Sequence, residues 1–239
     1  MEFLILNQQL ILQKLDLSHN DITKIDELNT LMNLEELYLS DNQITKIEGF
    51  DNLLNLQKLY MLNNQITKLE NLKNLINLQE FRLSKNKITK LEGLDNLINL
   101  QILDLSNNLI IIIEGFDNLL MLQTLKLEYN QIMLISGLEN LINLQELNLS
   151  TNKITKIIGI NNLINLQYFD INNNQITTIT GLENLINLQQ IRLVDNQLTN
   201  IPDTITTLNK LTVFAYYNNI NVNMSYKVQC FLKNLLTGY

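Results

Sequence analysis

The chain is poor in the residue types on which many catalytic and metal-binding proteins depend. Its 239 residues include one cysteine, one histidine and no tryptophan. A single cysteine, Cys230, excludes an internal disulfide, and with His19 alone there is no set of ligands for a Cys/His zinc site. The motifs CxxC, HExxH, GxxxxGK[ST] and GxGxxG are missing too. The composition therefore predicts a protein that is not an enzyme and uses no metal and no cofactor.

Positive charge and long apolar runs are also scarce. Lys and Arg number 17 against 24 Asp and Glu, which gives a net charge of −7. Nucleic-acid binding depends on clustered Lys and Arg, so this balance argues against it. Nothing approaches the ~20 apolar residues of a membrane span, and residues 1–15 lack the basic leader of a signal peptide. We expect one soluble domain in the cytoplasm, with the nucleus as an alternative location.

Asparagine, by contrast, is abundant and recurs at a fixed spacing. It closes the nine-residue phrase LxxLxLxxN, and self-similarity at a period of 22 residues predicts a stacked-repeat architecture. The phrase ends at Asn20, Asn42, Asn64, Asn86, Asn108, Asn130, Asn152, Asn174 and Asn196, and a tenth copy ends at Asn219 after 23 residues.

One unit, LEELYLSDNQITKIEGFDNLLN, runs from Leu34 to Asn55. Leu37 and Leu39 alternate with polar residues, which predicts a short half-buried strand. The later apolar residues fit neither a helix nor a strand, but they suit a chain that coils once around its own apolar side chains. Because one coil cannot bury its leucines alone, neighbouring coils must stack. We expect one domain over 1–239: a cap in 1–11, about ten repeats in 12–220, and a capping helix in 221–239.

The recurring asparagines have a structural explanation. Each follows the predicted strand, where backbone groups lack partners, and a side-chain amide can both donate and accept hydrogen bonds there. Stacked coils would align these amides into a ladder. Glycine recurs at another position, exemplified by Gly49 and Gly93, where a left-handed backbone is expected. Asn71 takes that position in one unit.

The unit LQYFDINNNQITTITGLENLIN resembles the 22-residue class of leucine-rich repeats, as found in the regulatory subunit of protein phosphatase 1. The resemblance implies an α/β right-handed solenoid, curved like a horseshoe, with a parallel sheet on the concave face and short 3-10 or irregular turns on the convex face. It also implies a concave surface whose acidic and aromatic residues bind the phosphatase catalytic subunit.

The outward strand positions are the candidate partner-binding residues, since the repeat does not dictate their identity. Tyr38, Tyr60 and Leu62 fall on neighbouring strands, and aromatic anchors with charged neighbours are typical of binding hot spots. The alternative is that these tyrosines only pack against their cross-strand neighbours. The full predicted site is Glu36, Tyr38, Tyr60, Leu62, Glu80, Arg82, Asp104, Lys126, Tyr129, Glu146, Tyr168 and Asp170.

A second candidate interface lies on another side of the coil. Most units place Thr-Lys after the first isoleucine that follows the recurring asparagine. Two adjacent units instead carry Ile111, Ile112, Met133 and Leu134, which predicts either an exposed apolar strip or a locally altered packing.

Three functions fit these observations. The first is a non-catalytic regulatory subunit for a phosphatase catalytic subunit, and the second is an adaptor for another intracellular protein. The third is a bacterial adhesin of the internalin type, which would require an export signal. The oligomeric state and the identity of the partner stay open at this point.

Overall fold

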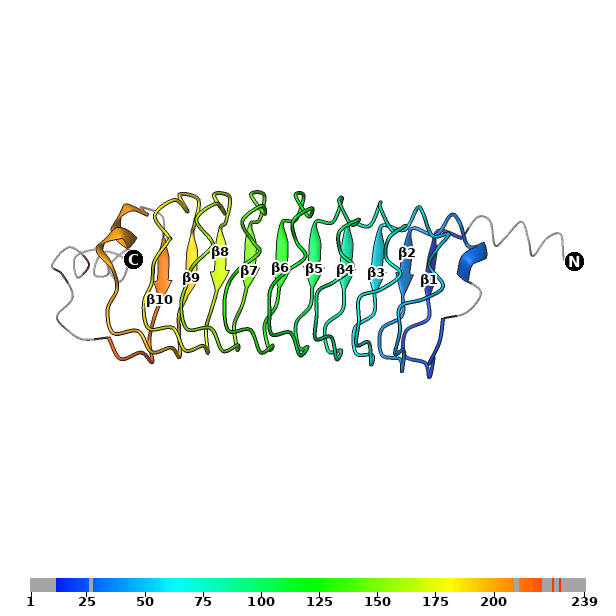
Figure 1. Ribbon diagram of the computed structural model, residues 1–239, viewed down its shortest axis with the longest axis horizontal. Helices are drawn as coiled ribbons and strands as arrows, with labels where there is room; N and C mark the ends of the chain where they lie inside the picture. The colour runs from blue at the N-terminus through cyan, green and yellow to red at the C-terminus, as the bar shows by residue number, and fades with distance from the viewer. Residues whose placement is uncertain (1–11, 26–27, 209–210, 221–224, 226–227, 229–239) are drawn as a thin grey trace, which may run out of the picture.

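The chain winds into a single row of coils in the computed structural model, which describes residues 12–25, 28–208, 211–220, 225 and 228 (Figure 1). One strand of each coil joins a ten-stranded sheet in the order β1 to β10, and each neighbouring pair is parallel. The strands are β1 Lys14–Asp16, β2 Glu36–Tyr38, β3 Lys58–Tyr60, β4 Glu80–Arg82, β5 Ile102–Asp104, β6 Thr124–Lys126, β7 Glu146–Asn148, β8 Tyr168–Asp170, β9 Gln190–Arg192 and β10 Thr212–Phe214.

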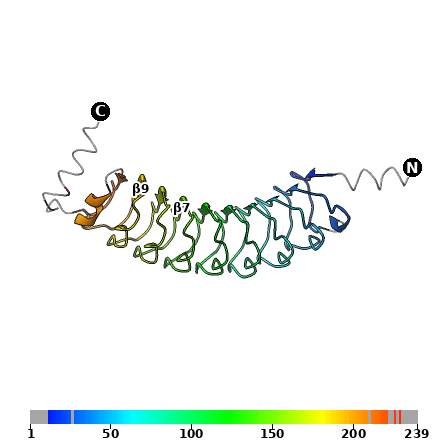
Figure 2. The same ribbon diagram turned by 90° about the horizontal axis from the view of Figure 1, so that it is seen from above.

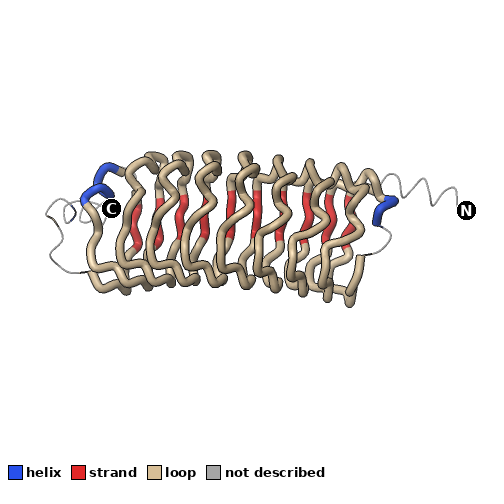
Figure 3. The backbone as a smooth tube through the Cα atoms, in the orientation of Figure 1, coloured by secondary structure: helices blue, strands red, loops and turns tan. Residues whose placement is uncertain are grey.

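The row of coils is curved, with the strands inside the curve. Figure 3 shows the strands side by side in one layer, with loops and, near the two ends, short helices making up the rest of the coils, and Figure 2 shows the arc. Strands in a sheet lie about 4.8 Å apart, whereas the turns on the opposite side occupy more room, so stacking bends the row toward the sheet. The predicted curved solenoid with a concave parallel sheet is confirmed.

The core runs the length of the solenoid as stacked rows of aliphatic and aromatic side chains. In the unit that begins at Leu34, the predicted inward residues Leu37, Leu39, Ile44 and Phe50 all have no exposed surface. Burying a large aliphatic side chain contributes about 1.5–3 kcal/mol. Because equivalent residues recur in every coil, this contribution is repeated along the row.

Two short helical segments have both of their ends within the described residues, and Val228 is also helical. The two segments are the 3-10 helices η1, Leu28–Thr30, and η2, Asp203–Thr207. In most other coils two successive tight turns take their place: the Leu53 amide donates to the Phe50 carbonyl, and the Leu56 amide to the Leu53 carbonyl. The predicted 3-10 or irregular turns therefore take both forms.

The asparagine ladder is confirmed from Asn42 to Asn196. Asn108 shows the pattern: its Nδ2 donates to the carbonyls of Leu83, Leu105 and Ser106, at 3.1, 3.0 and 3.1 Å. Its Oδ1 accepts from the Ile88 amide at 3.0 Å. Each such side chain therefore closes its own turn and ties it to the preceding coil.

A second set of asparagines, which the sequence reasoning missed, links the turns before the strands. Asn55 and Asn77 donate through Nδ2 to the carbonyls of Met32 and Leu54, at 2.9 and 2.8 Å. The same bond recurs in most later coils, but Met121 occupies this position in one of them. Adjacent coils are thus hydrogen-bonded on both sides of the strand.

The last described coil differs from the prediction. The ladder residue is Asn218, not Asn219: its Oδ1 accepts from the Leu198 amide at 2.9 Å. The segment that contains helix η2 is one residue longer than the equivalent segment of the other repeats. The segment between Leu211 and β10 is one residue shorter. As a result, Val213 still pairs with Ile191. Phe214 and its second neighbour Tyr216 consequently face outward, whereas Val213 and Ala215 pack against the core.

Every described coil also has one left-handed residue directly before the ladder asparagine. The residues range from His19 (φ 57°) and Tyr129 (φ 56°) to Thr151 (φ 55°). Backbone bonds to the next coil hold this conformation, as when the Asp41 amide donates to the Leu62 carbonyl at 2.8 Å. At the recurring glycine position Asn71 has φ 60°, so the left-handed backbone predicted there is confirmed.

The predicted caps at 1–11 and 221–239 lie outside the described residues, apart from Ser225 and Val228. Val228 is buried and belongs to the hydrophobic core. Ser225 donates a hydrogen bond through Oγ to Asp203 of η2. Across the part of the chain that the structure describes, no helix has the length and apolar character needed to cross a bilayer.

Candidate functional site: the concave sheet

Four outward side chains of β1 to β4 form one continuous stack at the N-terminal end of the sheet. Parallel register places Tyr38 beside Tyr60, and their rings stack with centroids 4.7 Å apart and an interplanar angle of 5°. Lys14 Nζ lies 4.7 Å from the Tyr38 ring, and Arg82 Cζ lies 5.9 Å from the Tyr60 ring. A cation at each end of two stacked rings is a favourable arrangement, because the ring faces are electron-rich. We call these four residues the tyrosine stack.

Two carboxylates fix the tyrosine stack in place. Glu36 accepts hydrogen bonds from Lys58 Nζ and the Tyr38 hydroxyl, each at 2.8 Å, and these bonds, that of Lys58 first, lower the pKa of Glu36 to about 2. Glu80 forms an ion pair with Arg82. Burial, followed by the contact with Glu80, raises the pKa of Tyr60 above its ordinary value. The predicted residues Glu36, Tyr38, Tyr60, Glu80 and Arg82 therefore lie together.

The centre of the concave face is acidic. Asp104 is buried and accepts from the Ser106 amide and hydroxyl at 3.0 and 2.7 Å. Lys126 lies 3.5 Å from Glu146. Burial, with a smaller effect of Asp104 and Glu146, raises the pKa of Glu128, whose Oε2 is buried without a hydrogen-bond partner in the described structure. Glu128 was not among the predicted site residues.

We expect Glu128→Gln to stabilise the protein at pH 7. A raised carboxyl pKa means that the folded state binds the proton more tightly than the unfolded state, so ionisation opposes folding. Stability is therefore greatest below the unfolded pKa of about 4.3 and falls as pH rises through the raised folded pKa. Thermal melts from pH 4 to pH 8 should show a gain for the variant that disappears toward pH 4. Glu114→Gln, at an exposed position, is the control. An equal gain at all pH values would contradict this account.

A second aromatic cluster lies at the C-terminal end of the sheet. Arg192 Cζ is 5.4 Å from the Tyr168 ring and 5.8 Å from the Phe214 ring. Asp170, itself buried, accepts from the Tyr168 hydroxyl at 3.0 Å. Burial first, and then Asp170, raises the pKa of Tyr168 to about 12.

Beyond this cluster lie aromatic residues that the sequence reasoning did not assign to the site. Tyr216 and Tyr217 meet edge to face with centroids 5.1 Å apart, and they are 60% and 74% exposed. A pocket of about 190 Å³ opens among Asn172, Arg192, Val194, Phe214 and Tyr216. If Asn218 is taken as the ladder residue of the last repeat, the repeat pattern places Phe214 and Tyr216 at outward positions of the sheet.

The remaining predicted residues are Leu62, Tyr129 and the four residues of the apolar strip. Leu62 follows β3 and is half-buried, while Tyr129 is exposed in the left-handed turn after β6. Ile111, Ile112, Met133 and Leu134 are all close to half exposed, in agreement with the predicted apolar strip.

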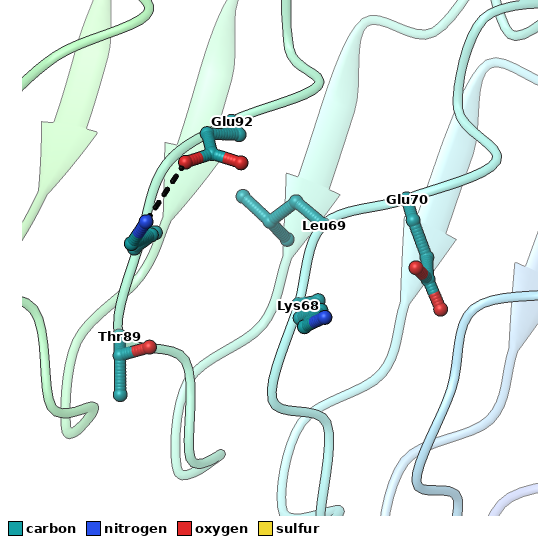
Figure 4. Close-up of a pocket in the computed structure, with 6 residues that line it drawn as sticks. Lys68, Leu69, Glu70, Thr89 and Glu92 are labelled. Atoms are coloured by element: carbon teal, nitrogen blue, oxygen red, sulfur yellow. Dashed lines mark hydrogen bonds and ion pairs between the residues drawn. The ribbon is translucent and has the colours of Figure 1, made fainter.

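A pocket lies on the loops of the third and fourth coils. It has a volume of about 340 Å³ and is lined by Lys68, Leu69, Glu70, Thr89, Lys90 and Glu92, with Lys90 paired to Glu92 at 3.2 Å (Figure 4). No histidine or cysteine lines it. Over the residues described, no group of three His, Cys, Asp or Glu side chains is placed to hold a metal.

Sequence comparison identifies the class of protein that this fold defines. Residues 12–52, 33–74, 76–118, 142–184 and 164–211 match the family described as leucine-rich repeats (two copies). The chain belongs to the leucine-rich repeat family, whose members are typically non-catalytic scaffolds that bind proteins. No curated protein sequence matches significantly.

Among solved structures, the chain is similar to a leucine-rich repeat protein of Leptospira interrogans. The two are 31% identical with a TM-score of 0.86, over 97% of this chain and 60% of the other, so this chain spans less than two thirds of that one. It is also similar to internalin C2 of Listeria monocytogenes, with 32% identity and a TM-score of 0.60 over 81% of this chain and 76% of the other.

Proposed function

We propose that the concave sheet binds an extended segment of a partner protein, with the tyrosine stack as its anchor. The observation that carries the proposal is that the stack is already assembled. Tyr38 and Tyr60 hold each other parallel, and Lys14 and Arg82 cover the outer faces of the pair. Because these side chains are ordered before binding, they lose less conformational entropy when a partner docks there.

The charge along the face indicates the chemistry of the partner. Asp104, Glu128 and Glu146 lie between the two aromatic clusters, and Asp170 belongs to the second of them. Lys126, on β6, is the basic residue among these acids. A partner segment with aromatic or aliphatic residues at both ends and basic residues between them would complement this order. The distance from β3 to β8, five strand spacings of about 4.8 Å, suits an extended peptide of roughly seven residues.

Within this class, the phosphatase regulator remains a prediction from the sequence resemblance, and a phosphatase catalytic subunit is one partner to test. The likeness to internalin C2 supports the alternative of a bacterial adhesin-like binding protein. A location in the cytoplasm is likewise part of the proposal. Affinity purification from the native cell, followed by identification of the co-purified proteins, would separate these alternatives.

Replacing both Tyr38 and Tyr60 by alanine should weaken the purified partner's binding at least 30-fold. Truncating a hot-spot residue commonly costs about 2 kcal/mol or more. The thermal melt should change little, because neither residue is part of the core. The control is Lys24→Ala with Lys46→Ala, both at exposed positions outside the sheet, which should leave the dissociation constant unchanged. Unchanged binding of the tyrosine variant would move the site away from the stack.

Replacing both Glu36 and Glu80 by lysine should act differently, by slowing association. If the partner surface is basic, reversal of these charges removes electrostatic steering, and the association rate becomes less sensitive to salt. Stopped-flow measurements at two ionic strengths would check this. An unaltered salt dependence would show that charge at this end of the sheet does not guide the partner.

A further inference from the structure

Exposed aliphatic side chains form a line along the turns that lead into the strands. One residue per coil contributes, and in six consecutive coils 46–52% of its surface is exposed: Leu54, Ile76, Ile98, Leu120, Ile142 and Ile164. Met32 and Ile186 extend the line at its two ends and are 50% and 73% exposed. We call this line the aliphatic ridge.

The fold itself does not require apolar residues on the aliphatic ridge. Other residues of each turn pack it against the core. In the turn that contains Leu54, these are Leu53 and Leu56, which are both fully buried. Solvent-exposed positions in such turns are ordinarily free to be polar. A contiguous apolar surface of a few hundred Å² on a soluble domain marks an interaction site.

A row of acids runs beside the aliphatic ridge. The two successive turns are closed by bonds between residues three apart, so the side chain three positions before each ridge residue lies on the same face. Five of these side chains are exposed acids: Asp51, Asp95, Asp117, Glu139 and Glu183. Lys73 is the single base at this position between coils two and eight. Within the described residues none of the five acids forms an ion pair, so their charge is available to a partner.

We propose that the aliphatic ridge and its acidic row bind a basic amphipathic helix of a partner protein. An α-helix rises about 5.4 Å per turn, close to the coil spacing of about 4.8 Å, which widens away from the sheet. A helix lying along the ridge can therefore set one apolar residue against each coil, and lysines or arginines beside its apolar stripe would face the acids. The ridge from Met32 to Ile186 covers seven coil spacings, about 35 Å, or about 23 helical residues.

A second copy of the chain fits this surface less well. If two copies met ridge to ridge about a two-fold axis perpendicular to the ridge, their arcs would curve in the same direction. Their acidic rows would then face each other and repel. If the two-fold axis ran parallel to the ridge, the acidic rows would lie on opposite sides of the contact. The two arcs would then curve in opposite directions, away from each other. An anionic membrane would be repelled by the same acids. The proposal concerns a different face from the concave sheet and does not depend on it.

A labelled synthetic helix tests the proposal. The probe has about 24 residues, with leucines at helical spacing flanked by lysines, and its twin has glutamates in place of the lysines. Fluorescence anisotropy with the full chain should show saturable binding of the lysine peptide and none of the glutamate peptide. Ile98→Ser with Leu120→Ser should weaken binding at least tenfold, and so should Asp95→Lys with Asp117→Lys.

Matched controls keep the outcome decisive. Ile111→Ser with Ile112→Ser removes two equally exposed aliphatic residues outside the ridge and should leave the affinity unchanged, as should the Tyr38 and Tyr60 double variant. Thermal melts should show all variants folded, because the altered positions are on the surface. Equal binding of both peptides, or an unaffected ridge variant, would overturn the proposal. Ridge-dependent self-association in sedimentation, or ridge-dependent binding to phosphatidylserine vesicles, would overturn it in favour of the other occupants.

Discussion

Asn108→Ala is expected to lower the free energy of unfolding by about 1–3 kcal/mol, the cost of a buried polar group left without a partner. The three carbonyls that Asn108 contacts each keep a second donor: Asn86 for Leu83, Asn130 for Leu105, and the Lys85 amide for Ser106. The buried Ile88 amide has Asn108 Oδ1 as its acceptor and would lose it. Urea denaturation of the variant and the parent chain measures the difference.

The matched control is the first rung of the same ladder. Asn20 is exposed, and among the described residues its Nδ2 bonds the carbonyls of its own turn alone, Leu17 and Ser18. Water can replace these bonds, so Asn20→Ala should change the unfolding free energy by no more than about 0.5 kcal/mol. Equal losses at the two positions would mean that the ladder does not act by satisfying buried backbone groups.

Gly93→Ala is expected to destabilise the chain by about 2–5 kcal/mol. Gly93 has φ +92°, a conformation that costs an L-residue about 1–2 kcal/mol. A Cβ at this position would also collide with the Leu69 carbonyl oxygen of the preceding coil, and overpacking adds about 1–3 kcal/mol. Denaturant titration again provides the measurement.

Gly159→Ala separates the two contributions. Gly159 has a similar φ of +73°, but a Cβ there would lie 3.4 Å from the Ile135 carbonyl oxygen, an ordinary contact. This variant should show only the conformational cost of about 1–2 kcal/mol. If both alanines destabilise equally, the close approach of coils at Gly93 has no energetic consequence.

The solenoid could be predicted from the sequence because each coil repeats the same physical solution. Leu37, Leu39 and Phe50 were assigned to the core from spacing alone, and all are fully buried. The ladder followed from the need to satisfy backbone groups after each strand, and Asn71 was correctly placed in a left-handed conformation. Tyr38 and Tyr60 were also expected side by side, because parallel strands of equal register bring equivalent positions together.

The last coil and parts of the site could not be predicted in this way. Two phrases overlap near the end, one closing at Asn219 and one at Asn218, and the choice depends on how η2 accommodates an additional residue. Asp104 is buried and accepts a hydrogen bond from the Ser106 hydroxyl. Both features depend on three-dimensional packing that the repeat pattern does not specify. The aliphatic ridge could not be predicted from the repeat, because the repeat specifies the buried residues of each turn, such as Leu53 and Leu56, and leaves the exposed residue between them free.

The asparagine ladder has a consequence for how such a chain can change its length. Each of its bonds between coils joins one repeat position to a fixed position in the next, as Asn108 does with Leu83 and Ile88. If one whole unit of 22 residues were removed or duplicated, the new neighbours would meet with the same donors opposite the same acceptors. Insertion of any other number of residues would break this correspondence unless a turn absorbed the difference, as η2 does. The hydrogen bonds that stabilise the stack thus also permit growth or shortening in whole coils, so that the reach of a binding surface can vary without a redesign of the interior.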